Sequence, residues 1–295
     1  MTRAAAMLSL VAAMSMTGAN VPLVKLLLAS IPPGILLPAR FLLAAAVLTV
    51  MVRHEPGQRL GALGCRQWGA IALLAVVGSV LFTWFVLEGV QRTSGASAGI
   101  ILSALPAVVA VAGIARGERL RSGEIVMIAF AVAGVALIQG EPTSVNEATT
   151  STWLGNVLIA CAVLCEAAFV LVARRISTEI GPIRLSLAVA IVTLIVCVPI
   201  GAAAVPSFDL RFLDARSALL FGWYAMTASV LCTVLWYRGV AHVETWAAGL
   251  ATTAVPVSAL ATSVLILGEP LSAAQLAGAG LVIAAILAGT LSRPE

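Results

Sequence analysis

The chain has 295 residues, of which 61% are apolar and 10% charged, and it carries a net charge of +4 with a mean hydropathy of +1.09. Because a soluble domain carries about a quarter charged residues, this composition excludes a soluble globular protein and leaves most of the surface to face lipid. The basic residues lie between apolar runs and not in one patch, so no nucleic-acid partner is expected. The five cysteines fit neither a disulfide framework nor a zinc motif, so neither a metal nor any other cofactor is expected.

Ten segments are apolar and long enough, or nearly so, to cross a hydrocarbon core of about 30 Å as helices. They cover roughly residues 6–28, 34–52, 68–87, 95–115, 124–139, 153–173, 185–204, 218–237, 246–267 and 273–291. The connections between them are short and rich in Gly, Pro and charged residues. The pattern predicts an all-α polytopic membrane protein whose first segment is an uncleaved helix and not a signal peptide.

The first segment carries two polar side chains with two readings each. Asn20 lies about two-thirds of the way across, where it either contacts substrate or forms a hydrogen bond to another helix. Lys25 lies near the end of the segment, where it either snorkels to the interface or takes part in gating.

The third segment combines polar and aromatic residues. Trp84 lies one turn before Glu88 on the same helical face, so we expect both, together with Ser79, at the substrate cavity. Aromatic side chains of this kind recognise ligands by stacking or cation–π contact. The alternatives are an interfacial aromatic belt for Trp84 and interfacial snorkelling for Glu88.

The fourth segment contains Pro106 and opens with a sequence that imitates a hydrolase motif. Residues 95–99 read GASAG, but a nucleophilic serine of that type needs a preceding strand and a nearby histidine. Here the motif opens an apolar segment, and the two histidines lie in loops, so no catalytic residue is expected. A proline inside a helix frees a backbone carbonyl and permits bending, so Pro106 is a candidate hinge.

The sixth segment holds the strongest functional candidate. Glu166 lies about halfway across it, between apolar residues, where an ionisable group costs a few kcal/mol and is a functional candidate by default. In a cavity it can attract a substrate ammonium or carry a coupling proton. The alternative is a hydrogen-bonded carboxylate that joins helices. Arg175, at the end of this segment, has the same two readings as Lys25.

The eighth and ninth segments repeat the features of the third and fourth. SVLCTVLWYRGV (residues 229–240) matches SVLFTWFVLEGV (residues 79–90) after a shift of 150 positions, and the same shift relates Pro106 to Pro256. Tyr237 joins the candidate cavity residues, while Arg238 and Pro256 join the candidate gating residues. The chain is therefore expected to consist of two halves, residues 1–145 and 146–295. Because each half has an odd number of helices, the second must enter the membrane from the opposite side, as in the inverted repeats of secondary transporters.

The basic residues predict the orientation. With the N-terminus in the cytoplasm, 12 of the 17 Lys and Arg residues lie on the inner side, Arg40 lies within the second segment, and the outer side holds Lys25, Arg92, Arg211 and Arg216. This asymmetry predicts an inner (plasma) membrane protein with both termini in the cytoplasm.

The first hairpin resembles that of the drug/metabolite transporter superfamily, EamA type. The resemblance is carried by Gly18, Asn20, Lys25 and the Arg40-Phe41 pair, and by a proline followed by Gly-Glu in both halves, at Gly117-Glu118 and Gly268-Glu269. The tryptophan that often precedes the helix 1 glycine in this family is replaced here by Met16 or Thr17. The resemblance implies ten helices and transport of small metabolites. Within the family, it favours the YddG-like branch, which exports aromatic and other neutral amino acids.

The sequence thus predicts a secondary transporter that exports aromatic or other neutral amino acids by alternating access, and not an enzyme. Helices 1, 3, 4, 6, 8 and 9 are expected to line the path, while helices 5 and 10 pack outside it or form a homodimer. The partners are a small-molecule substrate and the lipid bilayer. The alternatives are another substrate class (a nucleotide-sugar, a drug or an organic cation), an intramembrane enzyme that uses Glu166 or Ser97, and a membrane scaffold.

Overall fold

The computed structural model describes residues 1–57, 59–140, 153–204 and 214–292. Within these ranges the chain is helical and contains no strand. The described residues include ten helical spans long and apolar enough to cross a membrane. This confirms the all-α polytopic fold that the sequence predicts.

The first repeat holds five spans. They are α1 (Arg3–Leu28); α2 (Pro33–Met51), followed by the short turn η1 (Val52–His54); α3 (Cys65–Ala75), η3 (Val76–Leu81) and α4 (Phe82–Val90) in continuous succession; α5 (Gly95–Ser103) and α6 (Leu105–Ile114); and α7 (Ser122–Gln139). A further short turn, η2 (Leu60–Ala62), precedes α3.

The second repeat follows the same plan. Its spans are α8 (Trp153–Ile176); α9 (Pro182–Ala204); α10 (Ala215–Tyr224), η6 (Ala225–Leu231) and α11 (Cys232–Val240); α12 (Thr245–Thr252), α13 (Ala254–Thr262) and η7 (Ser263–Leu267); and α14 (Ala273–Leu291). The expected boundary between residues 145 and 146 lies outside the described residues.

Side-chain caps begin several of these helices. Thr2 accepts a hydrogen bond at the start of α1, Ser94 at the start of α5 and Ser272 at the start of α14. Asp214 caps α10, and its hydrogen bonds with the side chain and backbone of Ser217 hold the pKa of this carboxyl below its ordinary value.

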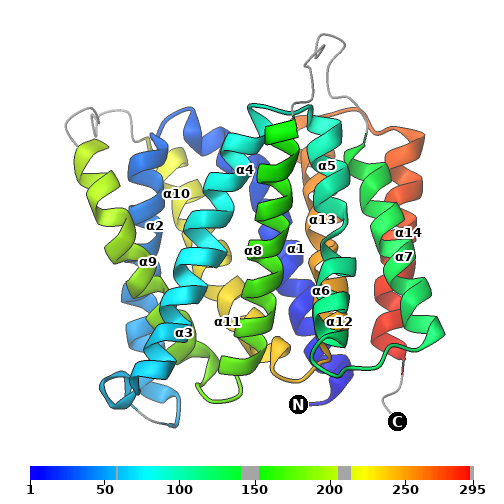
Figure 1. Ribbon diagram of the computed structural model, residues 1–295. Helices are drawn as coiled ribbons and strands as arrows, with labels where there is room; N and C mark the ends of the chain where they lie inside the picture. The colour runs from blue at the N-terminus through cyan, green and yellow to red at the C-terminus, as the bar shows by residue number, and fades with distance from the viewer. Residues whose placement is uncertain (58, 141–152, 205–213, 293–295) are drawn as a thin grey trace.

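The two repeats run in opposite directions through the bundle. In Figure 1 the start of α1 and the end of α14 lie at one face, which we call the terminal face; the other is the opposite face. The succession α3 to α4 runs from the terminal face to the opposite face, whereas α10 to α11 runs the other way (Figure 1). This is the inverted repeat that the shift of 150 positions predicts.

Irregular backbone recurs at equivalent places in the two repeats. The π-helical turns η3 and η6 interrupt the third and eighth spans at residues related by the same shift. The fourth and ninth spans each break just before a proline, at Ala104 ahead of Pro106 and at Thr253 ahead of Pro256. Since a proline cannot donate a backbone hydrogen bond, each break lies where the helix is weakest.

Two glycines of the repeated sequence set how closely the spans approach. A Cβ added at Gly89 in α4 would lie 2.6 Å from the Ile159 side chain of α8. A Cβ at Gly239 in α11 would lie 2.8 Å from Ala6 and Leu10 of α1. Thus α4 packs on α8 as α11 packs on α1, and the repeat explains why both copies keep a glycine there.

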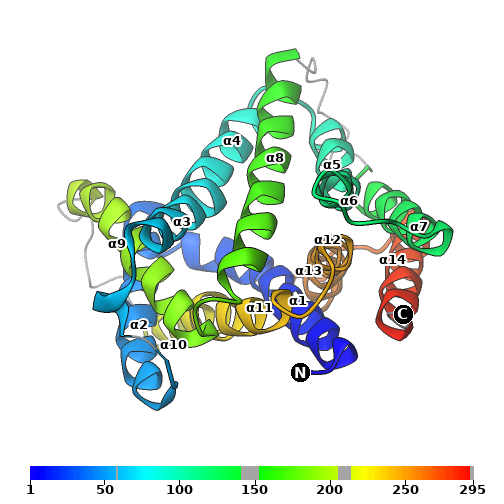
Figure 2. The same ribbon diagram turned by 60° about the horizontal axis from the view of Figure 1, so that its bottom comes forward.

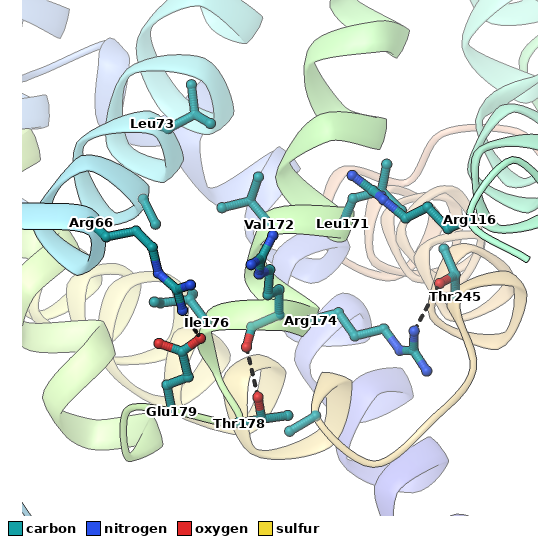
Figure 3. Close-up of a pocket in the computed structure, with 13 residues that line it drawn as sticks. Arg66, Leu73, Arg116, Leu171, Val172, Arg174, Ile176, Thr178, Glu179 and Thr245 are labelled. Atoms are coloured by element: carbon teal, nitrogen blue, oxygen red, sulfur yellow. Dashed lines mark hydrogen bonds and ion pairs between the residues drawn. The ribbon is translucent and has the colours of Figure 1, made fainter.

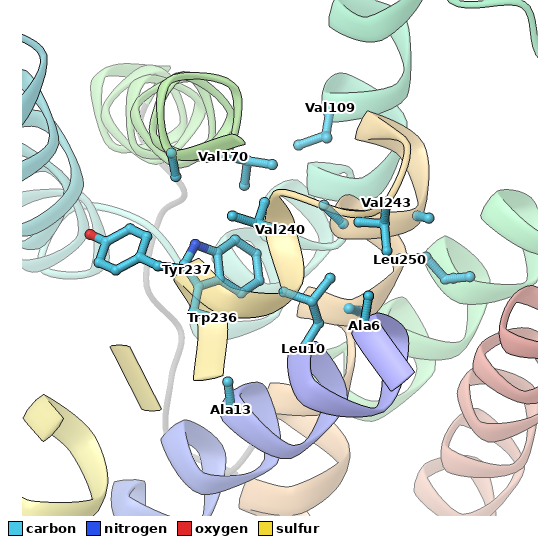
Figure 4. Packing of buried hydrophobic residues seen from close by; sticks show 14 of the residues in the cluster. Ala6, Leu10, Ala13, Val109, Val170, Trp236, Tyr237, Val240, Val243 and Leu250 are labelled. Carbon is cyan, nitrogen blue, oxygen red and sulfur yellow. The ribbon is translucent and has the colours of Figure 1, made fainter. Parts of the chain in front are cut away.

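The remaining spans pair at the edges of the bundle. Figure 2 shows α7 beside α14 at one edge and α2 beside α9 at another. The largest hydrophobic cluster joins α1, α6, α8, α11 and α12 (Figure 4) and extends to the inner faces of α7, α9 and α14. Spans 5 and 10 therefore pack on each other at the edge of the bundle, and α14 also contacts the start of α1, where Arg3 donates to the Gly289 carbonyl.

Candidate functional site

Polar side chains line the span that consists of α10, η6 and α11. Tyr224, Thr227 and Cys232 of this span form hydrogen bonds with polar residues of α1 and α2. Together they form what we call the central polar cluster, whose members are Thr17, Asn20, Arg40, Glu166, Tyr224, Thr227 and Cys232.

Asn20 and Thr227 join α1 to the π-helical turn η6. The Asn20 Nδ2 donates to the Thr227 Oγ1 at 3.0 Å and to the Met16 carbonyl at 2.8 Å, and the Thr227 hydroxyl lies 3.1 Å from Asn20 Oδ1. Both side chains are buried. π-helical turns are frequent at functional sites, because the irregular backbone re-aims side chains.

Arg40 joins α2 to α10. Its guanidinium donates a hydrogen bond to the Tyr224 hydroxyl and lies over the rings of Phe41, at 4.6 Å, and Tyr224, at 5.3 Å. Tyr224 is buried and Arg40 is half-buried.

Glu166 and Cys232 mark the part of the cluster nearer the terminal face. The thiol of Cys232 lies 3.0 Å from the Thr17 hydroxyl. Glu166, half-buried near the middle of α8, is close enough to Cys232 and Tyr237 for an electrostatic interaction. In the part of the chain that the structure describes, no hydrogen bond or ion pair satisfies its carboxylate.

An aromatic group lies next to Glu166 along the same helices. The Phe169 ring of α8 stacks on Trp236 with ring centroids 6.1 Å apart, and it lies 6.4 Å from the Tyr237 ring. In Figure 4 the Tyr237 hydroxyl points away from the aliphatic residues that surround Trp236. The indole Nε1 of Trp236 is buried without a hydrogen-bond partner.

A cavity of about 590 Å³ opens at the terminal face below this cluster. Its walls come from α3, α8, the end of α6 and the start of α12 (Figure 3). They include four arginines: Arg66, Arg116, Arg174 and Arg175. Leu171, which lines the cavity, follows Glu166 by about 7 Å along the axis of α8. The cavity therefore reaches to within two helical turns of Glu166 along α8.

An ion pair closes the helix ends beside this cavity. The Glu118 carboxylate accepts hydrogen bonds from Arg174 Nη1 at 2.7 Å, from Thr245 Oγ1 at 2.6 Å and from the Thr245 backbone N–H at 3.1 Å. Arg174 also donates to the Val243 carbonyl at 2.7 Å. The carboxylate thus joins the ends of α6 and α8 to the N-terminus of α12. We call this set the inner latch.

An equivalent ion pair lies at the opposite face. The Lys25 ammonium at the end of α1 lies 3.6 Å from the carboxylate of Glu269, which follows η7. In both repeats the acidic residue directly follows a glycine with positive φ, Gly117 at 94° and Gly268 at 67°. We call the Lys25–Glu269 pair the outer latch. The basic partner of Glu118 is Arg174. Arg175, the candidate gating residue expected from the sequence, is the next residue in the chain; it is exposed and lines the cavity.

The other expected site residues lie apart from the cluster. Ser79 is half-buried in η3, and Trp84 is half-exposed and packs on Phe85. Glu88 forms an ion pair with Arg92 one turn later in the chain. Arg238 is exposed, and its backbone carbonyl contacts His242.

Sequence reasoning missed several residues of the site. From the sequence alone, Arg40 and Glu118 are notable only because they carry the resemblance to the family. Arg174 is only one of the basic residues that predict the orientation. The signal for Arg40 was its position inside an apolar segment, which is as costly as that of Glu166. Thr17, Thr227 and Cys232 carry no such signal, since short polar side chains are common in membrane helices.

Known proteins are similar to this one over nearly the whole chain. Residues 4–140 and residues 153–290 each match the EamA-like transporter family. The chain is 30% identical over 292 residues to an uncharacterized transporter, YetK, of Bacillus subtilis (strain 168). The aligned region covers 98% of this chain and 88% of that protein. A solved crystal structure with 17% identity superposes with a TM-score of 0.76 over 98% of this chain and 99% of that one, which shows a shared fold.

Proposed function

The chain belongs to the EamA-like transporter family of small-metabolite transporters, and on this basis we propose that it exports aromatic or other neutral amino acids by alternating access. The proposed path is lined by the central polar cluster. It ends in the cavity at the terminal face, which we place in the cytoplasm with both chain ends.

The carboxylate of Glu166 supports this proposal most strongly. It is half-buried in the middle of a membrane span and has no partner among the described residues. An isolated carboxylate there is costly unless water, a substrate or a proton neutralises it. The ammonium group of an amino acid fits this position, and so does a coupling proton.

The aromatic group supports an amino acid with a flat or bulky side chain. One turn of α8 separates Phe169 from Glu166, and its ring contacts those of Trp236 and Tyr237. These two residues follow Cys232 by one to two turns of α11. A ring next to a carboxylate suits an aromatic side chain that lies beside an ammonium group.

The two latches support alternating access. The inner latch joins the end of the fourth span to the end of the sixth, and the outer latch joins the end of the ninth span to the end of the first. The two latches lie at opposite faces and at equivalent places in the repeats. We infer that one latch opens while the other holds, so that the site is exposed to one side at a time. Pro106 and Pro256, at the breaks of the same spans, are the proposed hinges.

An organic cation is the second candidate substrate, because a carboxylate beside aromatic rings also suits a cation that has no carboxylate of its own. Reconstitution distinguishes the two. Liposomes that contain the purified protein are tested with labelled neutral amino acids and labelled organic cations, with and without a pH gradient. The proposal requires saturable flux of at least one neutral amino acid above that of empty liposomes. Flux of cations alone would replace it with the second candidate.

A further inference from the structure

Arg40 differs from three other arginines that are buried or half-buried in the bundle. The guanidinium of Arg184 lies beside Glu55, that of Arg3 beside Glu244 and that of Arg174 beside Glu118. Arg40 lies deeper in its span than any of these, yet no carboxylate of a described residue forms an ion pair with it. Its hydrogen-bond partner is the neutral phenol of Tyr224.

The donors of Arg40 are incompletely satisfied. A guanidinium carries five N–H groups and cannot lose its charge in a protein. The Nε of Arg40 is buried and has no hydrogen-bond partner. A charged side chain at membrane depth costs about 2.5–3.5 kcal/mol and is normally paired. The structure thus holds a fixed cation whose counter-ion is missing from the described chain.

The surroundings of Arg40 hold its plane without neutralising it. The rings of Phe41 and Tyr224 face the guanidinium at 4.6 and 5.3 Å. Such contacts restrain the side chain, and the buried Nε–H that they leave without an acceptor is a donor suited to a planar anion. The thiols of Cys197 and Cys232 interact electrostatically with the guanidinium but provide no carboxylate to pair with it.

Arg40 and Glu166 both lie near the eighth span, where Arg40 donates a hydrogen bond to Tyr224 of α10. Both lie within electrostatic range of the Cys232 thiol, Arg40 from α2 and Glu166 from α8. Two opposite charges without ionic partners therefore converge on the central polar cluster. A zwitterion is the chemistry that neutralises both.

We propose that Arg40 binds the carboxylate of the transported substrate. The edge of the guanidinium would donate to the carboxylate, while the rings of Phe41 and Tyr224 restrain its faces. The proposal rests on the proposed function, since it assigns the second charge of an amino acid whose ammonium is assigned to Glu166. It also separates amino acids from organic cations, because the latter would leave Arg40 without a counter-ion.

The test varies the ligand as well as the protein. Binding to the purified full-length protein in detergent is measured for phenylalanine, for phenylalaninamide, which lacks only the carboxylate charge, and for benzoate. We expect wild type to bind the acid at least about ten-fold more tightly than the amide, as for a charge-assisted hydrogen bond. Arg40→Gln should bind the two equally. Tyr224→Phe, which keeps the ring and removes the hydroxyl, should retain the preference.

Each outcome decides one proposal. An equal affinity of wild type for acid and amide overturns the role of Arg40 without any variant, and so does a preference that Arg40→Gln preserves. If wild type binds no amino acid but binds benzoate, and Arg40→Gln abolishes this, the anion site holds and the amino acid assignment fails. If Arg40→Gln does not fold, Arg40→Lys replaces it, and its preference for the acid should fall because an ammonium lacks the planar fork.

Discussion

Arg174 and Glu118 form a 2.7 Å ion pair at the terminal face that has a counterpart, Lys25 with Glu269, at the opposite face. The inner pair is the tighter, because Thr245 also donates to Glu118. Equivalent helix ends of the two repeats are thus joined at opposite faces, in each case by an ion pair between a basic side chain and a glutamate. The proposal of alternating access rests on this relation.

Loss of one latch should shift the protein toward the state that is open at that face. Glu118→Gln weakens the inner latch and Glu269→Gln the outer one, so the two variants should shift the equilibrium in opposite directions. The probe is a cysteine at Val172 in the cavity wall, in a background without the native cysteines. Its labelling by a thiol reagent should become faster in Glu118→Gln and slower in Glu269→Gln. A change of the same sign in both variants would contradict the two-latch assignment.

Gly18 should tolerate no larger residue, because α1 approaches α13 closely there. A Cβ at this position would lie 2.1 Å from both Ser258 Oγ and the Val255 carbonyl. Gly18→Ala should lower the free energy of unfolding by about 1–3 kcal/mol, since the helices must separate. Gly222→Ala is the matched control, because a Cβ there meets no atom within 4 Å. It should leave the melting temperature in detergent unchanged or raise it slightly. Equal melting temperatures of the two variants would refute the close approach.

Glu55 should contribute more to stability than any exposed acidic residue. It accepts hydrogen bonds from the backbone N–H groups of Ile183 and Arg184 at 2.9 and 2.8 Å, and its side chain is 9% exposed. Glu55→Ala leaves Arg184 buried without a counter-ion, while its hydrogen bonds to the backbone carbonyls of residues 55 and 56 remain, and should cost about 3–5 kcal/mol. Glu179→Ala breaks the exposed pair with Arg66 and should cost about 1 kcal/mol or less. Unfolding in a denaturant series compares them, and similar losses would count against the buried pair.

Both ends of the chain should lie in the cytoplasm. The structure places the start of α1 and the end of α14 at the same face (Figure 1), and the excess of basic residues predicted on that side assigns the face. Reporters that are active on only one side of the membrane, fused at residues 1 and 295, measure this. Activity outside the cytoplasm from either fusion would reverse the assignment of the cavity and of the transport direction.

Much of the fold could be predicted from the sequence, because lipid leaves few alternatives. A backbone in hydrocarbon must satisfy its own hydrogen bonds, so apolar segments of this length become helices, and an odd number of helices per repeat requires inversion. The ends were less accurate: the third span begins at Cys65 and ends at Val90, beyond the expected residues 68–87. The π-helical turns η3 and η6 could not be predicted, since they depend on packing against other spans.

The candidate site was only partly predictable. Glu166 and Asn20 are polar residues within apolar segments, and the structure brings both to the central polar cluster through the eighth span. Their partners could not be read from the chain, because Asn20 and Thr227 are 207 positions apart. The one-residue difference between Arg174 and Arg175 has the same origin. Helical spacing alone does not say which of two adjacent basic residues meets a carboxylate from another span.

The most direct test of the account measures substrate flux with and without the charge of Glu166. Glu166→Gln keeps the shape and the hydrogen-bonding capacity of the side chain and removes its titratable charge. Glu124→Gln is the matched control, because Glu124 caps α7 at the terminal face, outside the proposed path. In liposomes that contain equal amounts of folded protein, we expect flux of the neutral amino acid to fall several-fold in Glu166→Gln and to stay unchanged in Glu124→Gln. Wild-type flux through Glu166→Gln at all pH values between about 5 and 8, a range around neutral pH that brackets the unperturbed pKa of histidine but lies above that of a carboxylate, would contradict the central role of this carboxylate.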